Sequence, residues 1–184
     1  MLRKALIATL ALAIPAASAI PQTMVIGGGL ASDCYKAVKA GETNFRKVDR
    51  ICTDALRQET LTRENRAATY INRGIARMRA DNLEDSLEDY QSALDLRPDL
   101  GAAYLNRGAA LIFMDDYEAA REALDKAIEL ETEDLHAAYY NRAIAREQSG
   151  DVAGAYYDFQ SAKERKPDWE RVDRQLARFT ITQN

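Results

Sequence analysis

The stretch Tyr70-Ile71-Asn72-Arg73-Gly74 returns at 104–108 as Tyr-Leu-Asn-Arg-Gly and at 139–143 as Tyr-Tyr-Asn-Arg-Ala. Successive copies are 34 and then 35 residues apart. A constant period of this length is typical of a helical repeat array. A second signature, a large residue followed three positions later by Ala, keeps the same period, and its large residues are Tyr90, Leu124 and Phe159.

Each repeat has the composition of a helical hairpin. The small residue that closes the five-residue motif allows two helices to approach closely, and the large residue of the second signature fills the space beside it. Polar pairs predict the turn between the two helices, at Asp81-Asn82, Asp115-Asp116 and Gly150-Asp151. Because one hairpin cannot bury its apolar face alone, the units are expected to stack on one another.

These features resemble the tetratricopeptide repeat, a helix–turn–helix unit of 34 residues. The resemblance covers 67–100, 101–134 and 136–169, with Leu135 as a one-residue insertion. A degenerate hairpin at 32–66 keeps only the second-helix signature. The resemblance implies an all-α fold, a right-handed superhelical array of antiparallel helix pairs. We also expect a C-terminal capping helix and tail over 170–184, with Val172, Leu176 and Phe179 on one face of the helix.

The N-terminus predicts export. Two basic residues precede the apolar run 5–14, Pro15 interrupts it, and Ala17-Ser18-Ala19 supplies a cleavage site. We therefore expect a cleaved signal peptide over 1–19, a flexible linker over 20–31, and a periplasmic or secreted protein. An uncleaved anchor is the alternative, although the apolar run is shorter than the ~20 residues that span a bilayer.

Export changes the interpretation of the two cysteines, Cys34 and Cys52. In an oxidising compartment an even pair predicts a disulfide. The two residues lie at similar distances on either side of the turn expected at 41–44, so an antiparallel hairpin would place them at nearly the same height. Two independent buried thiols are the alternative.

The residue directly before the motif glycine departs from the family pattern, which has Leu there. This sequence instead has Arg73, Arg107 and Arg142. One interpretation is a ladder that binds carboxylates, since Arg does so with two hydrogen bonds. The other is a structural ion pair inside each unit, because Asp89 and Asp158 lie sixteen residues after the first and third arginines. The same offset from the second arginine reaches Ala123. The offsets favour the structural interpretation and leave Arg107 without a predicted partner.

The resemblance also implies a binding surface, the concave groove formed by the first helices. Arg79 is the only cation among the groove-facing slots of the three full units, so the family's carboxylate clamp is poorly matched. We expect an apolar groove that binds a protein or peptide partner. The alternative is that the chain's own tail or a second copy fills the groove. The apolar slots singled out are Ile71, Ile75, Met78, Leu105, Ala109, Ile112, Phe113, Tyr140 and Ile144.

Other function classes find little support. The net charge of −4 does not favour nucleic acid or anionic lipid. His136 is the single histidine and has no nucleophile nearby in the sequence, while the acidic turns lack the ligand spacing of an EF-hand. We therefore predict neither an enzyme nor a metal or cofactor site. The predicted function is that of an exported adaptor or scaffold, with a self-associating structural module as the alternative.

Overall fold

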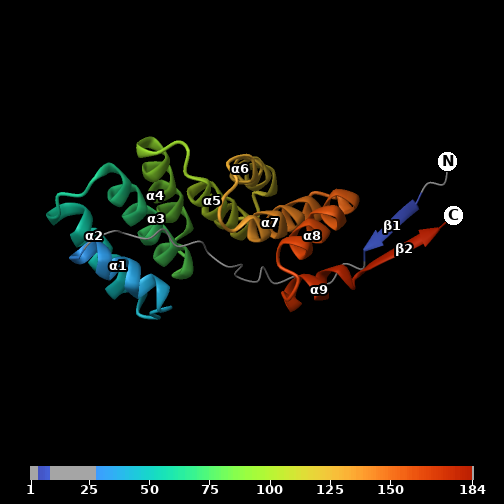
Figure 1. Cartoon of the computed structure of the whole chain (residues 1–184), viewed down its shortest axis with the longest axis horizontal. Helices are drawn as coiled ribbons and strands as arrows, with labels where there is room; N and C mark the ends of the chain where they lie inside the picture. Colours follow the sequence, from blue (N-terminus) through green and yellow to red (C-terminus); the bar gives the residue numbers. More distant parts are fainter. Residues whose placement is uncertain (1–3, 9–27, 184) are drawn as a thin grey trace.

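The computed structural model describes residues 4–8 and 28–183 of the 184-residue chain. In this part nine helices follow one another, and two short strands lie near the chain ends. Figure 1 shows antiparallel helical hairpins stacked side by side into an elongated array. The all-α array is thus confirmed, with one small two-stranded addition. The elements are β1 (Lys4–Ala8), α1 (Leu30–Lys39), α2 (Phe45–Gln58), α3 (Arg63–Arg79), α4 (Leu83–Leu96), α5 (Gly101–Phe113), α6 (Tyr117–Glu129), α7 (Leu135–Gln148), α8 (Val152–Arg165), α9 (Glu170–Leu176) and β2 (Phe179–Gln183).

The helices form two layers. The first helices of the hairpins, α1, α3, α5 and α7, contact one another in chain order, and we call their common surface the first-helix face. The second helices α2, α4 and α6 each contact their own first helix and the first helix of the next hairpin. Each hairpin therefore buries its apolar surface against its neighbours, as a stacked array requires.

The turns inside the three full units share one backbone conformation. Asp81, Asp115 and Gly150 have φ values of 64°, 59° and 86°, in the left-handed region. The following residue caps the second helix in two units: the Oδ1 of Asp116 accepts from the N–H of Ala119 at 3.2 Å, and that of Asp151 from the N–H of Gly154 at 2.9 Å. The three predicted turns are confirmed.

The motif glycines are required by close helix packing. A Cβ atom added to Gly74 would lie 2.5 Å from Cε1 of Tyr90, and one added to Gly108 would lie 2.5 Å from Cγ of Leu124. Such distances are too short without a shift of the buried neighbour. In the last unit Ala143 takes the place of the glycine, and both Ala143 and Phe159 are fully buried. The two helices of this unit therefore pack with a Cβ atom at the position that is glycine in the other two units.

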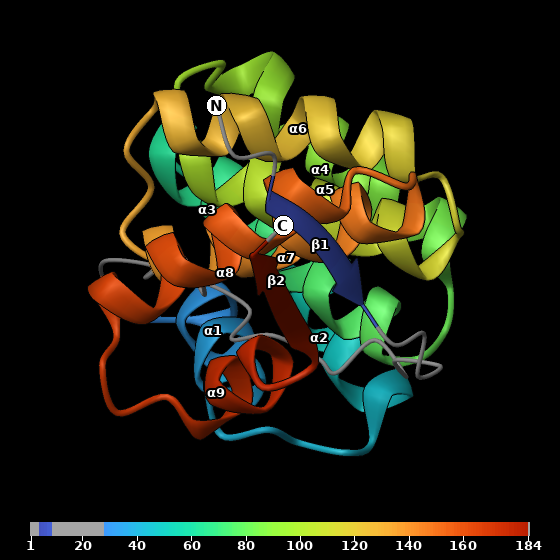
Figure 2. The ribbon, with the colours of Figure 1, turned by 90° about the vertical axis from the view of Figure 1, so that its right-hand side faces the viewer.

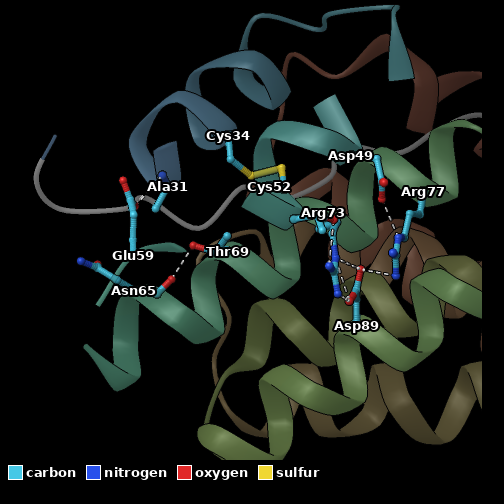
Figure 3. The surroundings of a disulfide bond; sticks show 11 residues. Ala31, Cys34, Asp49, Cys52, Glu59, Asn65, Thr69, Arg73, Arg77 and Asp89 are labelled. Atoms are coloured by element: carbon cyan, nitrogen blue, oxygen red, sulfur yellow. Dashed lines mark hydrogen bonds and ion pairs between the residues drawn. A yellow bond between two sulfur atoms is a disulfide. The ribbon is translucent and has the colours of Figure 1, made fainter. Parts of the chain in front are cut away.

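The N-terminal hairpin is held at two places (Figure 3). Cys34 of α1 and Cys52 of α2 form the predicted disulfide, and neither side chain is exposed. In the chain-entropy model, closing a loop with a sequence separation of 18 stabilises the folded state by about 3 kcal/mol. The carboxylate of Glu59, just after α2, accepts from the N–H groups of Leu30 and Ala31 and so satisfies the first turn of α1.

The expected N-terminal segments are described only in part. Residues 1–3 and 9–27, which include most of the predicted signal peptide and linker, lie outside the described residues. Residues 4–8 form β1, and α1 begins at Leu30, one residue before the predicted end of the linker. No helix in the described ranges has the length and apolar character that a bilayer-spanning segment needs.

The C-terminal end differs from the expectation. Helix α9 ends at Leu176, and Phe179 lies instead in β2, which pairs antiparallel with β1. The run Thr180-Ile181-Thr182 explains the difference, because β-branched residues favour strands over helices. The ring of Phe179 still packs on the core, 5.9 Å from the ring of Phe159. Figure 2 faces this end of the array and shows the two strands in front of α8, which β1 contacts.

Candidate functional site

The first-helix face is more closed than the sequence predicts. A groove that binds a partner requires its slots to be partly exposed, and this prediction is wrong for seven of the nine apolar residues, which are 0–7% exposed. Ala109 is half-buried and Phe113 is 37% exposed. The seven buried residues are Ile71, Ile75, Met78, Leu105, Ile112, Tyr140 and Ile144.

At the N-terminal end, the first hairpin accounts for the burial. The slot residues of α3 belong to one apolar cluster with Cys34 and Val38 of α1, which packs directly against α3. Arg79, the single cation among the slots, donates from Nη1 to the backbone oxygen of Val38 at 2.9 Å. Met78 turns into its own hairpin, with its Sδ 4.0 Å from the hydroxyl of Tyr90. These slots are therefore part of the core.

At the C-terminal end, the segment around α9 covers the slots of α7. The ring of Trp169 lies 4.8 Å from the ring of Tyr140, and the amide of Gln175 donates to the Tyr140 hydroxyl at 3.4 Å. Arg178 forms an ion pair with Glu147, whose side chain is 3% exposed. The tail thus occupies the last unit's part of the first-helix face.

An apolar surface remains open in the middle unit. Phe113 and Met114, at the end of α5, are each 37% exposed and are two of the three large apolar residues that are exposed within residues 28–179. The same slot as Phe113 holds Arg79 in the unit before and Gln148 in the unit after. We call Phe113 and Met114 the open patch.

Two of the three motif arginines form buried ion pairs rather than an open ladder, and Figure 3 shows the pair of Arg73 with Asp89. Nη2 of Arg73 lies 2.7 Å from Oδ1 of Asp89, and the side chain of this aspartate is 2% exposed. Nη2 of Arg142 lies 2.7 Å from Oδ1 of Asp158, which is 4% exposed. The offset of sixteen residues therefore identified two structural pairs correctly. Arg107 instead contacts an exposed amide, the Oε1 of Gln91, at 3.2 Å.

In each of these two units a second arginine pairs with the same buried aspartate, and it was not predicted from the sequence. Nη1 of Arg77 lies 3.1 Å from Asp89, and Nη1 of Arg146 lies 3.0 Å from Asp158. The signal was present, because both follow the motif arginine by four residues, one helical turn. The middle unit has Leu111 at this position, so it lacks the second arginine together with the aspartate.

The same arginines also connect neighbouring units. Nη1 of Arg73 donates to the hydroxyl of Thr53 on α2 at 3.0 Å, and Nη1 of Arg142 lies 2.6 Å from Oδ1 of Asp125 on α6. Burial raises the pKa of Asp89, and the guanidinium groups of Arg73 and Arg77 offset part of this rise. Burial alone would lower the pKa of Arg142, but its hydrogen bonds with the two aspartates outweigh that effect and raise it. The network therefore contributes to the stacking of neighbouring hairpins.

A cavity of about 340 Å³ lies between α2 and the end of α3. It contains the ion pair between Arg77 and Asp49, and none of its lining residues is a predicted groove slot. The lining residues are Phe45, Arg46, Asp49, Ala76, Arg77, Ala80 and Asn82.

Comparisons with known proteins identify the repeat. Residues 101–134, the middle unit, match the family model described as Tetratricopeptide repeat. No curated protein sequence matches the chain significantly.

Solved structures show the same architecture at low sequence identity. A crystal structure of MamA has 22% identity and a TM-score of 0.66, and the match covers 82% of each chain. A tetratricopeptide repeat protein from Parabacteroides merdae has 20% identity and a TM-score of 0.64, with 80% of this chain and 55% of that chain covered. The first TPR of Spaghetti (RPAP3), bound to the HSP90 peptide SRMEEVD, has 19% identity and a TM-score of 0.58, with 60% of this chain and 87% of that chain covered. The chain therefore contains a tetratricopeptide repeat at residues 101–134 and folds as a solenoid of the kind that this repeat builds.

Proposed function

We propose that this protein is an exported, non-enzymatic adaptor that binds a protein or peptide partner through the open patch of its middle unit. The observation that carries the proposal is the exposure of Phe113 and Met114 on a first-helix face whose other large apolar slots are buried. Exposed apolar side chains grouped on a stable scaffold are a common feature of interaction sites. The fold itself is that of a protein-interaction scaffold.

The surroundings of the open patch suggest the chemistry of the partner. Asp115 and Asp116 follow Met114 directly and are exposed. A partner segment with a large apolar side chain flanked by a basic residue fits this combination. The Spaghetti repeat of similar fold is bound to the peptide SRMEEVD, which supports peptide binding as a use of this architecture. Its acidic peptide does not match the acidic rim found here.

The test replaces Phe113 by Glu and measures capture of partners by cross-linking in the cell envelope. Because Phe113 is partly exposed at a helix end, Phe113→Glu should leave the fold nearly unchanged while capture is lost. Tyr157→Glu is the matched control, since Tyr157 is 62% exposed on α8, outside the first-helix face. Equal capture by wild type and Phe113→Glu would remove the open patch from the binding site. Unfolding of Phe113→Glu would show that Phe113 belongs to the core.

Export is a separate part of the proposal. It is supported by the signal-like sequence of 1–19 and by the Cys34–Cys52 disulfide, which persists in oxidising compartments. The measurement is the intact mass of protein recovered from the periplasm or the medium. The expected chain begins at Ile20. A full-length mass in the cytosolic fraction would contradict export, and a full-length mass in the membrane fraction would support the uncleaved anchor.

A structural self-associating module is the second candidate, favoured by one observation. The segment around α9 already fills the α7 end of the first-helix face through Tyr140 and Glu147, so the face accepts a segment of this chain. Light scattering separates the candidates. Self-association that disappears in Phe113→Glu supports the self-associating module, whereas capture of a different protein without such association through Phe113 supports the adaptor.

A further inference from the structure

The outer surface of the second helices carries a repeated pattern of charge. Every hairpin has three exposed positions on its second helix. They lie six residues before, two before and five after the large residue of the second signature. In the first hairpin Cys52 occupies the place of the large residue. The spacings of four and seven residues put the three side chains on one face of each helix. The residues are Arg46, Arg50 and Arg57 on α2, Glu84, Glu88 and Asp95 on α4, Glu118, Glu122 and Glu129 on α6, and Ala153, Tyr157 and Glu164 on α8.

Two of these sets have opposite charge and identical spacing. We call the three arginines of α2 the basic triad and the three carboxylates of α4 the acidic triad. Adjacent members in each triad are separated by about 6 Å and about 10 Å along the helix axis, at a rise of 1.5 Å per residue. The two triads therefore match each other residue by residue if their helices lie parallel and at the same height.

The described part of the chain leaves both triads without ion pairs of their own. None of the three arginines forms a salt bridge there, and neither do Glu84 and Glu88. Asp95 accepts a hydrogen bond from the neutral amide of Gln91. The acidic set of α6 differs, because Arg121 pairs with Glu118 and Lys126 pairs with Glu129. Of the two acidic helices, α4 is thus the one whose charge is left for a partner.

We propose that the basic and acidic triads form the contact between two copies of this chain in a twofold-symmetric dimer. Helices α2 and α4 are equivalent second helices of neighbouring units. A twofold axis parallel to them and midway between them places the basic triad of each copy on the acidic triad of the other. Arg46, Arg50 and Arg57 then face Glu84, Glu88 and Asp95 of the second copy. Both copies contribute the same surface to the contact, as in any isologous dimer.

The strength of this contact follows from its exposure. Exposed ion pairs are individually weak and are screened by salt, so six of them give a dimer that forms at low salt and dissociates at high salt. The second helices lie on the other layer from the open patch. The dimer therefore does not depend on the proposed adaptor function, and it would leave the open patch accessible in each copy.

Sedimentation velocity of the purified protein tests the proposal. At about 0.1 M salt, where the Debye length is about 10 Å, we expect a dimer, and at about 1 M salt, where it is about 3 Å, a monomer. Reversal of the basic triad (R46E, R50E and R57E) should weaken dimerisation at low salt by at least about tenfold, and so should reversal of the acidic triad (E84R, E88R and D95R). All six positions are exposed, so circular dichroism should show unchanged helix content.

Mixing the two reversed variants gives the decisive result. Neither should dimerise alone, because both of its triads then carry the same sign, but the mixture should form a heterodimer. The matched control reverses the α6 set (E118R, E122R and E129R) and should leave the dimer intact. A wild-type monomer at low salt would overturn the proposal, and so would a mixture that fails to associate or a dimer lost on reversal of α6.

Discussion

Replacing Arg73 by Leu measures what the buried ion pairs contribute to stability. Arg73 donates to Asp89 from Nε at 3.0 Å and 3.2 Å and from Nη2 at 2.7 Å. The two side chains are 14% and 2% exposed, so solvent screens the pair little. After the substitution Asp89 keeps only Arg77, at 3.1 Å. Removing both cations would approach the 3–5 kcal/mol of a fully broken buried pair. Loss of one should lower the free energy of unfolding by about 1–3 kcal/mol.

The same substitution at Arg142 tests the buried pair of the last unit, and at Arg107 of the middle unit it serves as the control. Arg142→Leu removes the closest partner of Asp158 and leaves Arg146 at 3.0 Å, so a loss of similar size is expected. Arg107 contacts only an exposed amide among the interactions described, and no buried aspartate is stranded when it is replaced. Arg107→Leu should therefore be neutral or slightly stabilising, within about 0.5 kcal/mol.

Urea unfolding of the three variants at pH 7 and low salt is the assay. A double-mutant cycle between Arg73 and Asp89 should give a coupling energy of about 1–3 kcal/mol, whereas the cycle between Arg107 and Gln91 should give nearly none. Equal losses at all three arginines would refute the reasoning, because they would show that stability follows the motif position and not the buried aspartate.

Two further predictions use the same unfolding assay. Gly74→Ala should destabilise the fold by about 1–3 kcal/mol, because the new Cβ would lie 2.5 Å from the buried ring of Tyr90; a gain in stability, as helix propensity alone predicts, would contradict the packing argument. Burial and the nearby ammonium of Lys166 lower the pKa of His136, while Asp134 acts in the opposite sense. The unfolded chain then binds this proton at higher pH than the folded one, so stability should fall as the pH drops below about 6.5. His136→Gln should reduce this dependence, and an unchanged slope between pH 7.5 and pH 5 would show that other groups cause it.

The features predicted correctly from the sequence are those encoded within a single hairpin. The turns at Asp81, Asp115 and Gly150 and the pairs Arg73–Asp89 and Arg142–Asp158 all depend on residues less than one repeat apart, whereas the period itself compares successive hairpins. A fixed offset in such a hairpin corresponds to a fixed distance in space, so the sequence alone is informative. The disulfide between Cys34 and Cys52 follows the same rule, since both residues lie in the first hairpin.

The features predicted wrongly depend on contacts between hairpins. Ile71 and Ile75 occupy groove slots in their own unit, yet α1 packs over α3 and buries them. Tyr140 is covered by Trp169, which directly precedes α9, and by Gln175 of α9. The early end of α9 reflects a competition between helix and strand propensity that the apolar periodicity of Val172, Leu176 and Phe179 did not reveal.

The middle unit differs from its neighbours in two ways. It lacks the buried arginine–aspartate network, with Leu111 and Ala123 in the corresponding positions, and it alone carries an apolar residue, Phe113, in the slot that holds Arg79 and Gln148 elsewhere. If binding is confined to this unit, Arg79→Ala and Gln148→Ala should leave cross-linking capture unchanged while Phe113→Glu abolishes it. A loss of capture in all three variants would instead show that the partner extends along the whole first-helix face.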